Sequence, residues 1–162
     1  MRTPASARSG TATVSEMTDD LAAATNDTGT AWLDATAQAE LVRSGQVSAA
    51  ELVDAAIARI EKLNPTLNAV IHPLFERART AAAGALPEGP FRGVPLLLKD
   101  LGAELAGTPF CEGTAFAGDY HSTVDQELTR RFLAAGFVAV SYTHLPRAAP
   151  TWPPPGKAAP SC

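Results

Sequence analysis

The residue whose type and position best suit chemistry is Lys99. It follows directly after Leu96–Leu98, a continuous apolar run that is typical of a strand buried on both faces. The amine of a lysine at the end of such a strand is partly desolvated, and desolvation favours the neutral form that can accept a proton. Arginine could not replace it, because arginine keeps its proton in proteins. Lys99 is therefore the candidate general base, and the alternative is a structural lysine that pairs with Asp100 or reaches solvent along apolar surface.

Other side chains with reactive groups lack a supporting pattern. Cys111 could be a nucleophile, but neither it nor Cys162 lies in a CxxC motif, and we expect a small buried residue with a reduced thiol rather than a disulfide scaffold. Ser141 and Ser161 lie outside any glycine-rich loop, so neither is assigned as a nucleophile. No two histidines have metal-ligand spacing, which argues against a metal site; they are His72, His121 and His144.

Composition excludes several classes of protein. The chain has 162 residues with a net charge of -4, which argues against a general nucleic-acid binder with a basic stripe for phosphates, so we expect no nucleic-acid partner. No apolar run is long enough to span a membrane, and the N-terminus lacks the apolar segment of a secretory signal. These observations predict a cytoplasmic protein without a membrane partner.

The two ends of the chain differ from its middle in amino-acid composition. Residues 1–30 are polar and without periodicity, which predicts a disordered leader, and Met17 is a plausible true start. Residues 141–162 contain six of the 13 prolines and no acidic residue. We interpret this tail as a frame change or read-through of foreign sequence, and the alternative is a proline-rich tail that binds a partner.

Residues 31–140 alternate helical and strand patterns, which predicts an α/β sheet. Ser48 with Glu51 and Thr123 with Gln126 have the spacing of capping boxes, so each pair predicts the start of a helix. The segment 102–122 is rich in glycine and predicts a long irregular loop of functional type. The expected helices are Thr36–Ser44, Ser48–Leu63, Pro73–Gly84 and Thr123–Gly136, and the expected strands are Thr66–Ile71, Val94–Leu98 and Phe137–Val140.

The motif around the candidate base resembles the lysine segment of the amidase signature family; it reads Gly93-Val-Pro-Leu-Leu-Leu-Lys-Asp-Leu101. The resemblance covers about residues 31–140 and includes Glu127-Leu-Thr-Arg-Arg131. It implies the N-terminal part of a three-layer α/β/α fold with a mixed central sheet, incomplete in this chain. Within the family, residues 34–45 and 69–77 look most like cyclic-amide hydrolases of the 6-aminohexanoate cyclic dimer type.

The resemblance also implies a mechanism. The family hydrolyses amides with a Ser–cis-Ser–Lys triad, needs no metal or organic cofactor, and acts on small-molecule amides; Lys99 matches its lysine. Both serines belong to a later Gly/Ser-rich segment that is absent here, so we expect the chain alone to be inactive. Two alternatives stay open: a non-catalytic amidase-like binding module with a proline-rich interaction tail, and a fragment of an amidotransferase A subunit. Neither the substrate nor the oligomeric state is predicted.

Overall fold

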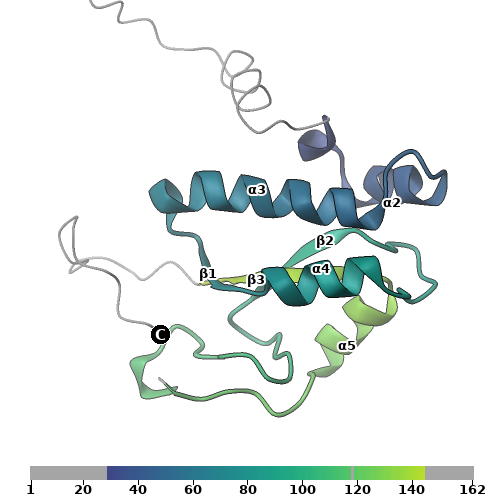
Figure 1. The fold of residues 1–162 in the computed structure, drawn as a ribbon. Helices are drawn as coiled ribbons and strands as arrows, with labels where there is room; N and C mark the ends of the chain where they lie inside the picture. Colours follow the sequence, from purple (N-terminus) through teal and green to yellow (C-terminus); the bar gives the residue numbers. More distant parts are fainter. Residues whose placement is uncertain (1–28, 118, 145–162) are drawn as a thin grey trace, which may run out of the picture.

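The computed structural model describes residues 29–117 and 119–144, and within them helices and strands alternate as the sequence predicts (Figure 1). In chain order the elements are η1 (Thr30–Trp32), α2 (Ala35–Arg43), α3 (Ala49–Leu67), β1 (Val70–Pro73), α4 (Phe75–Ala83), β2 (Pro95–Lys99), η2 (Ala115–Ala117), α5 (Glu127–Ala134) and β3 (Val138–Thr143). No helix in these residues is long and apolar enough to cross a membrane.

The three strands form one mixed sheet in the order β1-β3-β2. The central strand β3 runs antiparallel to β1 and parallel to β2. Opposite β2 the strand has a bulge, since Leu96 pairs with Ala139 but the next residue, Leu97, pairs with Ser141. The sheet therefore has the mixed character that the sequence predicts.

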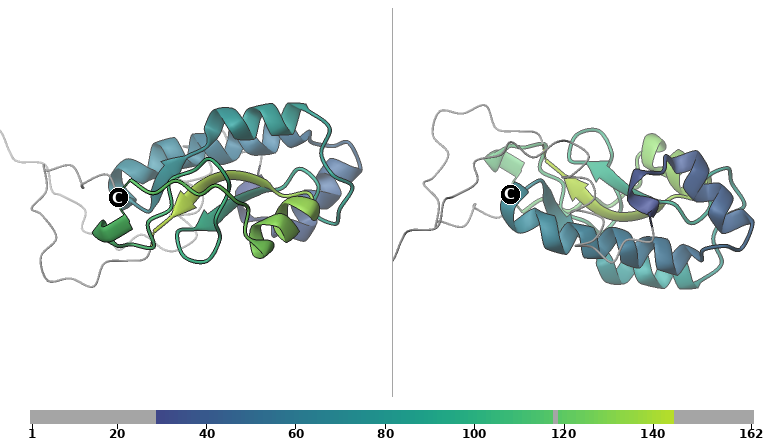
Figure 2. Two further views of the ribbon diagram at one scale, coloured as in Figure 1. Left: turned by 90° about the horizontal axis from the view of Figure 1, so that it is seen from below. Right: turned by 90° about the horizontal axis from the view of Figure 1, so that it is seen from above.

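Two apolar clusters cover the two faces of the sheet. Helices α3 and α4 lie side by side on one face, whereas α5 and the segment after β2 lie on the other (Figure 2). The first cluster consists of Val53, Ile57, Ala78, Ala82, Val138 and Val140. The second consists of Leu98, Ala103, Leu105, Phe110, Ala139 and Tyr142. Helix, sheet and helix thus make three layers, which confirms the predicted fold class.

Helix α3 confirms one capping box and corrects a predicted helix end. Ser48 accepts a hydrogen bond from the backbone N–H of Glu51, whose carboxylate accepts one from Ser48. Asn64-Pro65 does not end the helix, which continues to Leu67 with Pro65 inside it. The Asn64 side-chain amide instead donates to the carbonyl of Val70 and accepts from its N–H, both at 2.8 Å. These two hydrogen bonds connect the helix end to β1.

The second predicted capping box is wrong. Helix α5 begins at Glu127, and its N-cap Gln126 has no side-chain cap. The backbone N–H of Gln126 donates to the carbonyl of Glu104 at 3.1 Å, and its side-chain amide donates to the Glu104 carboxylate at 2.9 Å. These long-range bonds hold the chain extended up to Gln126, so the helix starts one turn later than Thr123 suggests.

The sequence predicts that β2 is buried on both faces, but in the structure β3 is the buried strand. β2 is only partly buried, with Leu97 39% exposed, because it has a partner on one side alone in the described residues. β3 is the strand buried on both faces. It also continues three residues beyond the predicted end at Val140, so residues 141–143 belong to the sheet. The predicted leader up to residue 28 and the tail from residue 145 lie outside the described residues, and the division of the chain stays a prediction.

Candidate functional site

Lys99 lies where the sequence places it, at the carboxyl end of β2. It pairs with Thr143 of β3, and its side chain is partly buried. Its amine donates a hydrogen bond to the carbonyl oxygen of His144, the residue that follows β3. The two parallel strands therefore fix both the backbone and the amine of the candidate base.

Asp100 does not pair with Lys99. Within the described residues its carboxylate accepts hydrogen bonds from the backbone N–H groups of Cys111, at 2.9 Å, and Gly113, at 3.3 Å. The backbone N–H of Asp100 donates to the carbonyl of Thr143 at 2.9 Å. The structural alternative for the lysine, an ion pair with its neighbour, is thus not formed, and Asp100 instead anchors the loop that follows β2.

This anchoring role of Asp100 was not predicted from the sequence. The signal that could have revealed it is an acidic residue that follows a buried strand directly and precedes a glycine-rich loop. Such a loop leaves backbone N–H groups without helix or sheet partners, and a buried carboxylate can accept from several of them. The partners themselves, eleven and thirteen residues away, follow only from the fold.

The segment 102–122 is irregular as predicted, apart from the short helix η2 and one isolated bridge between Pro109 and His121. The Glu104 carboxylate holds its two ends together, since it accepts from the hydroxyl of Ser122 at 2.7 Å and that of Tyr120 at 3.0 Å. These hydrogen bonds, that from Ser122 first, lower the pKa of Glu104 below its ordinary value. The loop is therefore an ordered wall beside the end of β2.

Tyr142 links this loop to the sheet. It is fully buried in β3, and its hydroxyl donates to the carbonyl oxygen of Ala103 at 3.0 Å, while the Thr108 hydroxyl lies 3.3 Å from it. Burial raises the pKa of Tyr142, so its phenol stays neutral. The contact orders the first turn of the loop after Lys99.

The structure does not bring the other reactive side chains into a catalytic group. Cys111 is almost fully buried, which suits a packing role and leaves it inaccessible as a nucleophile. The Ser141 hydroxyl donates to the carbonyl of His72 at 2.7 Å and so links β3 to β1. His121 is exposed on the loop, and no cluster of three or more metal-ligating side chains occurs in the part of the chain that the structure describes.

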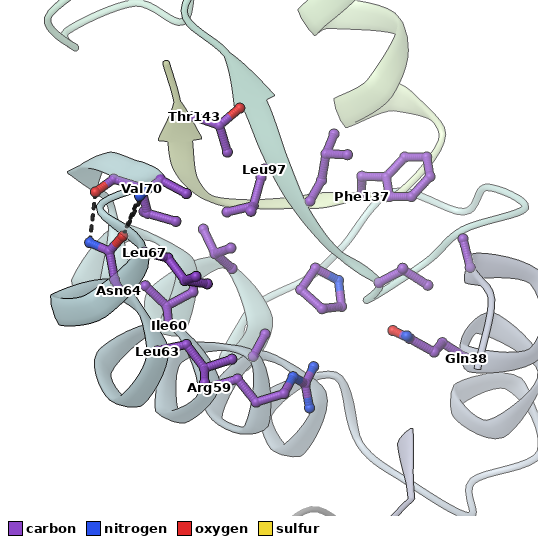
Figure 3. Close-up of a pocket in the computed structure, with 17 residues that line it drawn as sticks. Gln38, Arg59, Ile60, Leu63, Asn64, Leu67, Val70, Leu97, Phe137 and Thr143 are labelled. Atoms are coloured by element: carbon purple, nitrogen blue, oxygen red, sulfur yellow. Dashed lines mark hydrogen bonds between the residues drawn. The ribbon is translucent and has the colours of Figure 1, made fainter. Parts of the chain in front are cut away.

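A groove of about 580 Å³ lies between α3 and the sheet, and Lys99 does not line it. Figure 3 shows Ile60, Leu63 and Leu67 from α3 facing Leu97 from β2 across this groove. Its walls are apolar almost throughout. The groove therefore has the character of a packing surface, distinct from the polar end of β2.

Comparison with known proteins relates this chain to hydrolases of amide bonds. The family model described as Amidase matches residues 51–151. The 6-aminohexanoate-cyclic-dimer hydrolase of Paenarthrobacter ureafaciens is 48% identical over 118 residues, which are 71% of this chain and 23% of that protein. The solved structure of 6-aminohexanoate cyclic dimer hydrolase superimposes with a TM-score of 0.64 at 46% identity, over 69% of this chain and 23% of that one.

A second solved structure shows 6-aminohexanoate cyclic dimer hydrolase complexed with substrate; it has a TM-score of 0.62 and 47% identity over the same shares of the two chains. This chain thus spans about a quarter of the length of the relatives that it matches. The shared part includes both walls of the groove and the strand that carries Lys99.

Proposed function

Because the chain belongs to the amidase family, we propose that it is the N-terminal part of an amide hydrolase in which Lys99 is the general base. One observation carries this assignment: the Lys99 amine sits at the end of β2, partly buried, and donates to the His144 carbonyl. Among the described residues no carboxylate forms an ion pair with it. The geometry thus leaves the amine without a carboxylate partner among these residues, at the end of the strand and in the place that the family's lysine takes.

The proposed chemistry needs two further groups. The neutral amine of Lys99 takes a proton relayed through one serine hydroxyl, and this activates a second serine, which attacks the amide carbonyl. The C–N bond breaks as the departing nitrogen takes back the proton that Lys99 accepted, so the amine product leaves and an acyl-enzyme ester remains. Water then hydrolyses this ester to release the acid and restore the serine hydroxyl. The chain contains no Gly/Ser-rich segment that could supply both serines and the backbone N–H groups for the oxyanion. We therefore expect this chain to be inactive by itself.

The substrate class is a small-molecule amide. Support comes from the relative that was solved with its substrate bound, a hydrolase of a cyclic amide dimer. The described residues contribute the base and the ordered loop beside it, whereas the relatives carry most of their length in parts that this chain does not match. The cyclic-amide preference is accordingly a proposal for the complete enzyme.

A chimera tests the proposal. The matched N-terminal part of the Paenarthrobacter ureafaciens hydrolase is replaced by the corresponding part of this chain, and hydrolysis of the 6-aminohexanoate cyclic dimer is followed. Lys99→Ala should lower kcat by about 10³-fold or more, and Lys99→Arg should fail to restore it because arginine does not give up its proton. Lys62→Ala, on the exposed side of α3, serves as the control that keeps activity.

The alternatives give different results in the same assay. A chimera that folds and binds the dimer without hydrolysing it supports the non-catalytic binding module. An active chimera that keeps its kcat after Lys99→Ala contradicts the role of Lys99 as base. Hydrolysis by the unmodified 162-residue chain, lost in Lys99→Ala, contradicts the expectation that further segments are required.

A further inference from the structure

The start of β1 and the ends of β2 and β3 meet beside the candidate base. Thr143, the last residue of the central strand β3, pairs with Val70 of β1 on one side and with Lys99 of β2 on the other. The carbonyl that receives the Lys99 amine belongs to His144, which follows the end of β3. Strand pairing therefore does not hold this carbonyl in place, and another contact must do so.

The imidazole ring of His144 makes such a contact. Its Nδ1 lies 3.2 Å from the carbonyl oxygen of Ala69, the residue before β1. Because a carbonyl oxygen only accepts, Nδ1 carries the hydrogen and donates it. His144 thus makes one hydrogen bond toward β1 through its ring and another toward β2 through its own carbonyl, and its side chain is partly buried.

Asn64, near the end of α3, fixes the acceptor of this ring. Its Oδ1 accepts from the backbone N–H of Val70 at 2.8 Å and from that of Ala69 at 2.9 Å (Figure 3 shows Asn64 beside Val70). The peptide between Ala69 and Val70 is planar, so its N–H and its C=O point in opposite directions. Holding the N–H toward Asn64 therefore directs the Ala69 carbonyl toward His144.

We propose that Asn64 and His144 are positioning residues for the amine of Lys99. Asn64 orients the carbonyl of Ala69, this carbonyl holds the ring of His144, and the backbone of His144 presents its own carbonyl to the amine. The inference rests on the proposed function, because the position of this amine affects hydrolysis only if Lys99 is the base. A proton acceptor must lie within hydrogen-bond reach of its donor, and a misplacement of about 1 Å can lower the rate about 100-fold.

A test has to observe the amine itself, since a loss of stability would follow from a purely structural role as well. The sequence makes this feasible, because the chain has three lysines, Lys62, Lys99 and Lys157. Nuclear magnetic resonance of chains with carbon-13-labelled lysine gives one set of ε-methylene signals for each, and Lys99→Arg identifies the set of Lys99. A held amine makes the two ε protons inequivalent, whereas free rotation averages them to one signal.

The full 162-residue chain is used for this measurement. In the wild type the two ε-proton signals of Lys99 should be separate. His144→Ala removes the ring and should merge them, and Asn64→Ala should move them toward each other. His144→Asn is the conservative variant and should restore the separation, because asparagine carries an N–H donor on the same side-chain carbon, Cγ, as the histidine ring.

Ser48→Ala is the matched control. It removes the cap at the opposite end of α3 and lowers stability without touching the hydrogen bonds of Asn64, so the signals of Lys99 should stay separate. Circular dichroism of each variant identifies any chain that does not fold. His144→Ala changes a residue outside the helices and strands, so it tests the inference if Asn64→Ala unfolds.

Activity provides a second readout, in the chimera described above with this chain's residues up to His144. His144→Ala should lower kcat by about 10- to 100-fold with KM unchanged, and His144→Asn should restore kcat. A fall in KM-dependent binding with kcat intact would contradict positioning of the base.

Two results of the resonance experiment would overturn the inference. They are ε-proton signals of Lys99 that already coincide in the folded wild-type chain, and an unchanged separation in either folded alanine variant. The proposed function fails in a different way. If the signals merge in His144→Ala and stay separate in Ser48→Ala, while the kcat of the chimera does not depend on Lys99, the positioning is supported and the role as base is contradicted. A chimera that needs Lys99 but keeps its full kcat in His144→Ala contradicts this inference only.

Discussion

The carboxylate of Asp100 lies 2.9 Å from the backbone nitrogen of Cys111 and accepts its hydrogen bond, and both residues are almost fully buried. The same carboxylate accepts from Gly113. One side chain at the end of β2 therefore fixes the middle of the loop that borders Lys99. The loop keeps its place through a buried polar contact instead of a helix or a strand.

Asp100→Ala should destabilise the protein by about 1–3 kcal/mol, because it leaves the buried N–H of Cys111 without an acceptor and also removes the bond to the N–H of Gly113. Asp100→Asn keeps one acceptor oxygen and should lose less. Urea unfolding followed by circular dichroism measures both changes. Asp119→Ala, an exposed carboxylate of the same loop, is the control, and an equal loss in it and in Asp100→Ala would contradict the anchoring role.

The sequence predicts most elements here because their signals are local. The spacing of Ser48 and Glu51 marks the start of α3, and the apolar run before Lys99 marks a strand, since neighbours in sequence determine both. The helix continues past the predicted end at Pro65 because a proline removes only one backbone N–H donor, and the Asn64 side chain holds the last turn by binding the backbone of Ala69 and Val70.

The rest depends on contacts between distant residues. The start of α5 is set by Glu104, which holds Gln126 by backbone and side chain across more than twenty residues. The burial of β2 depends on what lies beside its outer edge, which periodicity does not encode. At the candidate site, the type of Lys99 and its place after a strand could be predicted, whereas its acceptor, the carbonyl of His144, required the pairing of β2 with β3.

The two predicted capping boxes allow a matched comparison. Ser48→Ala removes the acceptor for the Glu51 N–H and should cost about 1 kcal/mol of stability. Thr123→Ala changes a residue of the same predicted role that caps no helix in the structure, so its effect should stay within about 0.5 kcal/mol. Thermal unfolding of the two variants beside the wild type measures both. A larger loss for Thr123→Ala than for Ser48→Ala would contradict the assigned helix starts.

Gly136, which follows α5, should tolerate no side chain. Its φ is +96°, and a Cβ atom there would lie 2.6 Å from the Cα of Arg92. Gly136→Ala must therefore displace the turn before β2 in addition to straining the backbone. Gly102→Ala is the control, because its φ of +71° carries the strain while nothing lies within 4 Å of the added atom. The control should lose about 1–2 kcal/mol and Gly136→Ala clearly more in urea unfolding, and equal losses would contradict the close approach.

His72 on β1 should make stability depend on pH. Its ring meets that of Tyr142 edge to face, with centroids 6.2 Å apart, and desolvation by burial lowers the pKa of His72 below its ordinary value of 6.5. The unfolded chain then binds the proton more readily than the folded one, so this contribution to stability is complete above pH 6.5 and is lost as the pH falls below it. His72→Phe keeps the aromatic contact without the proton. Unfolding free energies measured from pH 8 to pH 5 should therefore fall less steeply in the variant, with the pH 8 values giving the packing difference alone. A wild-type curve as flat as that of the variant between pH 6.5 and pH 5 would contradict the assigned direction.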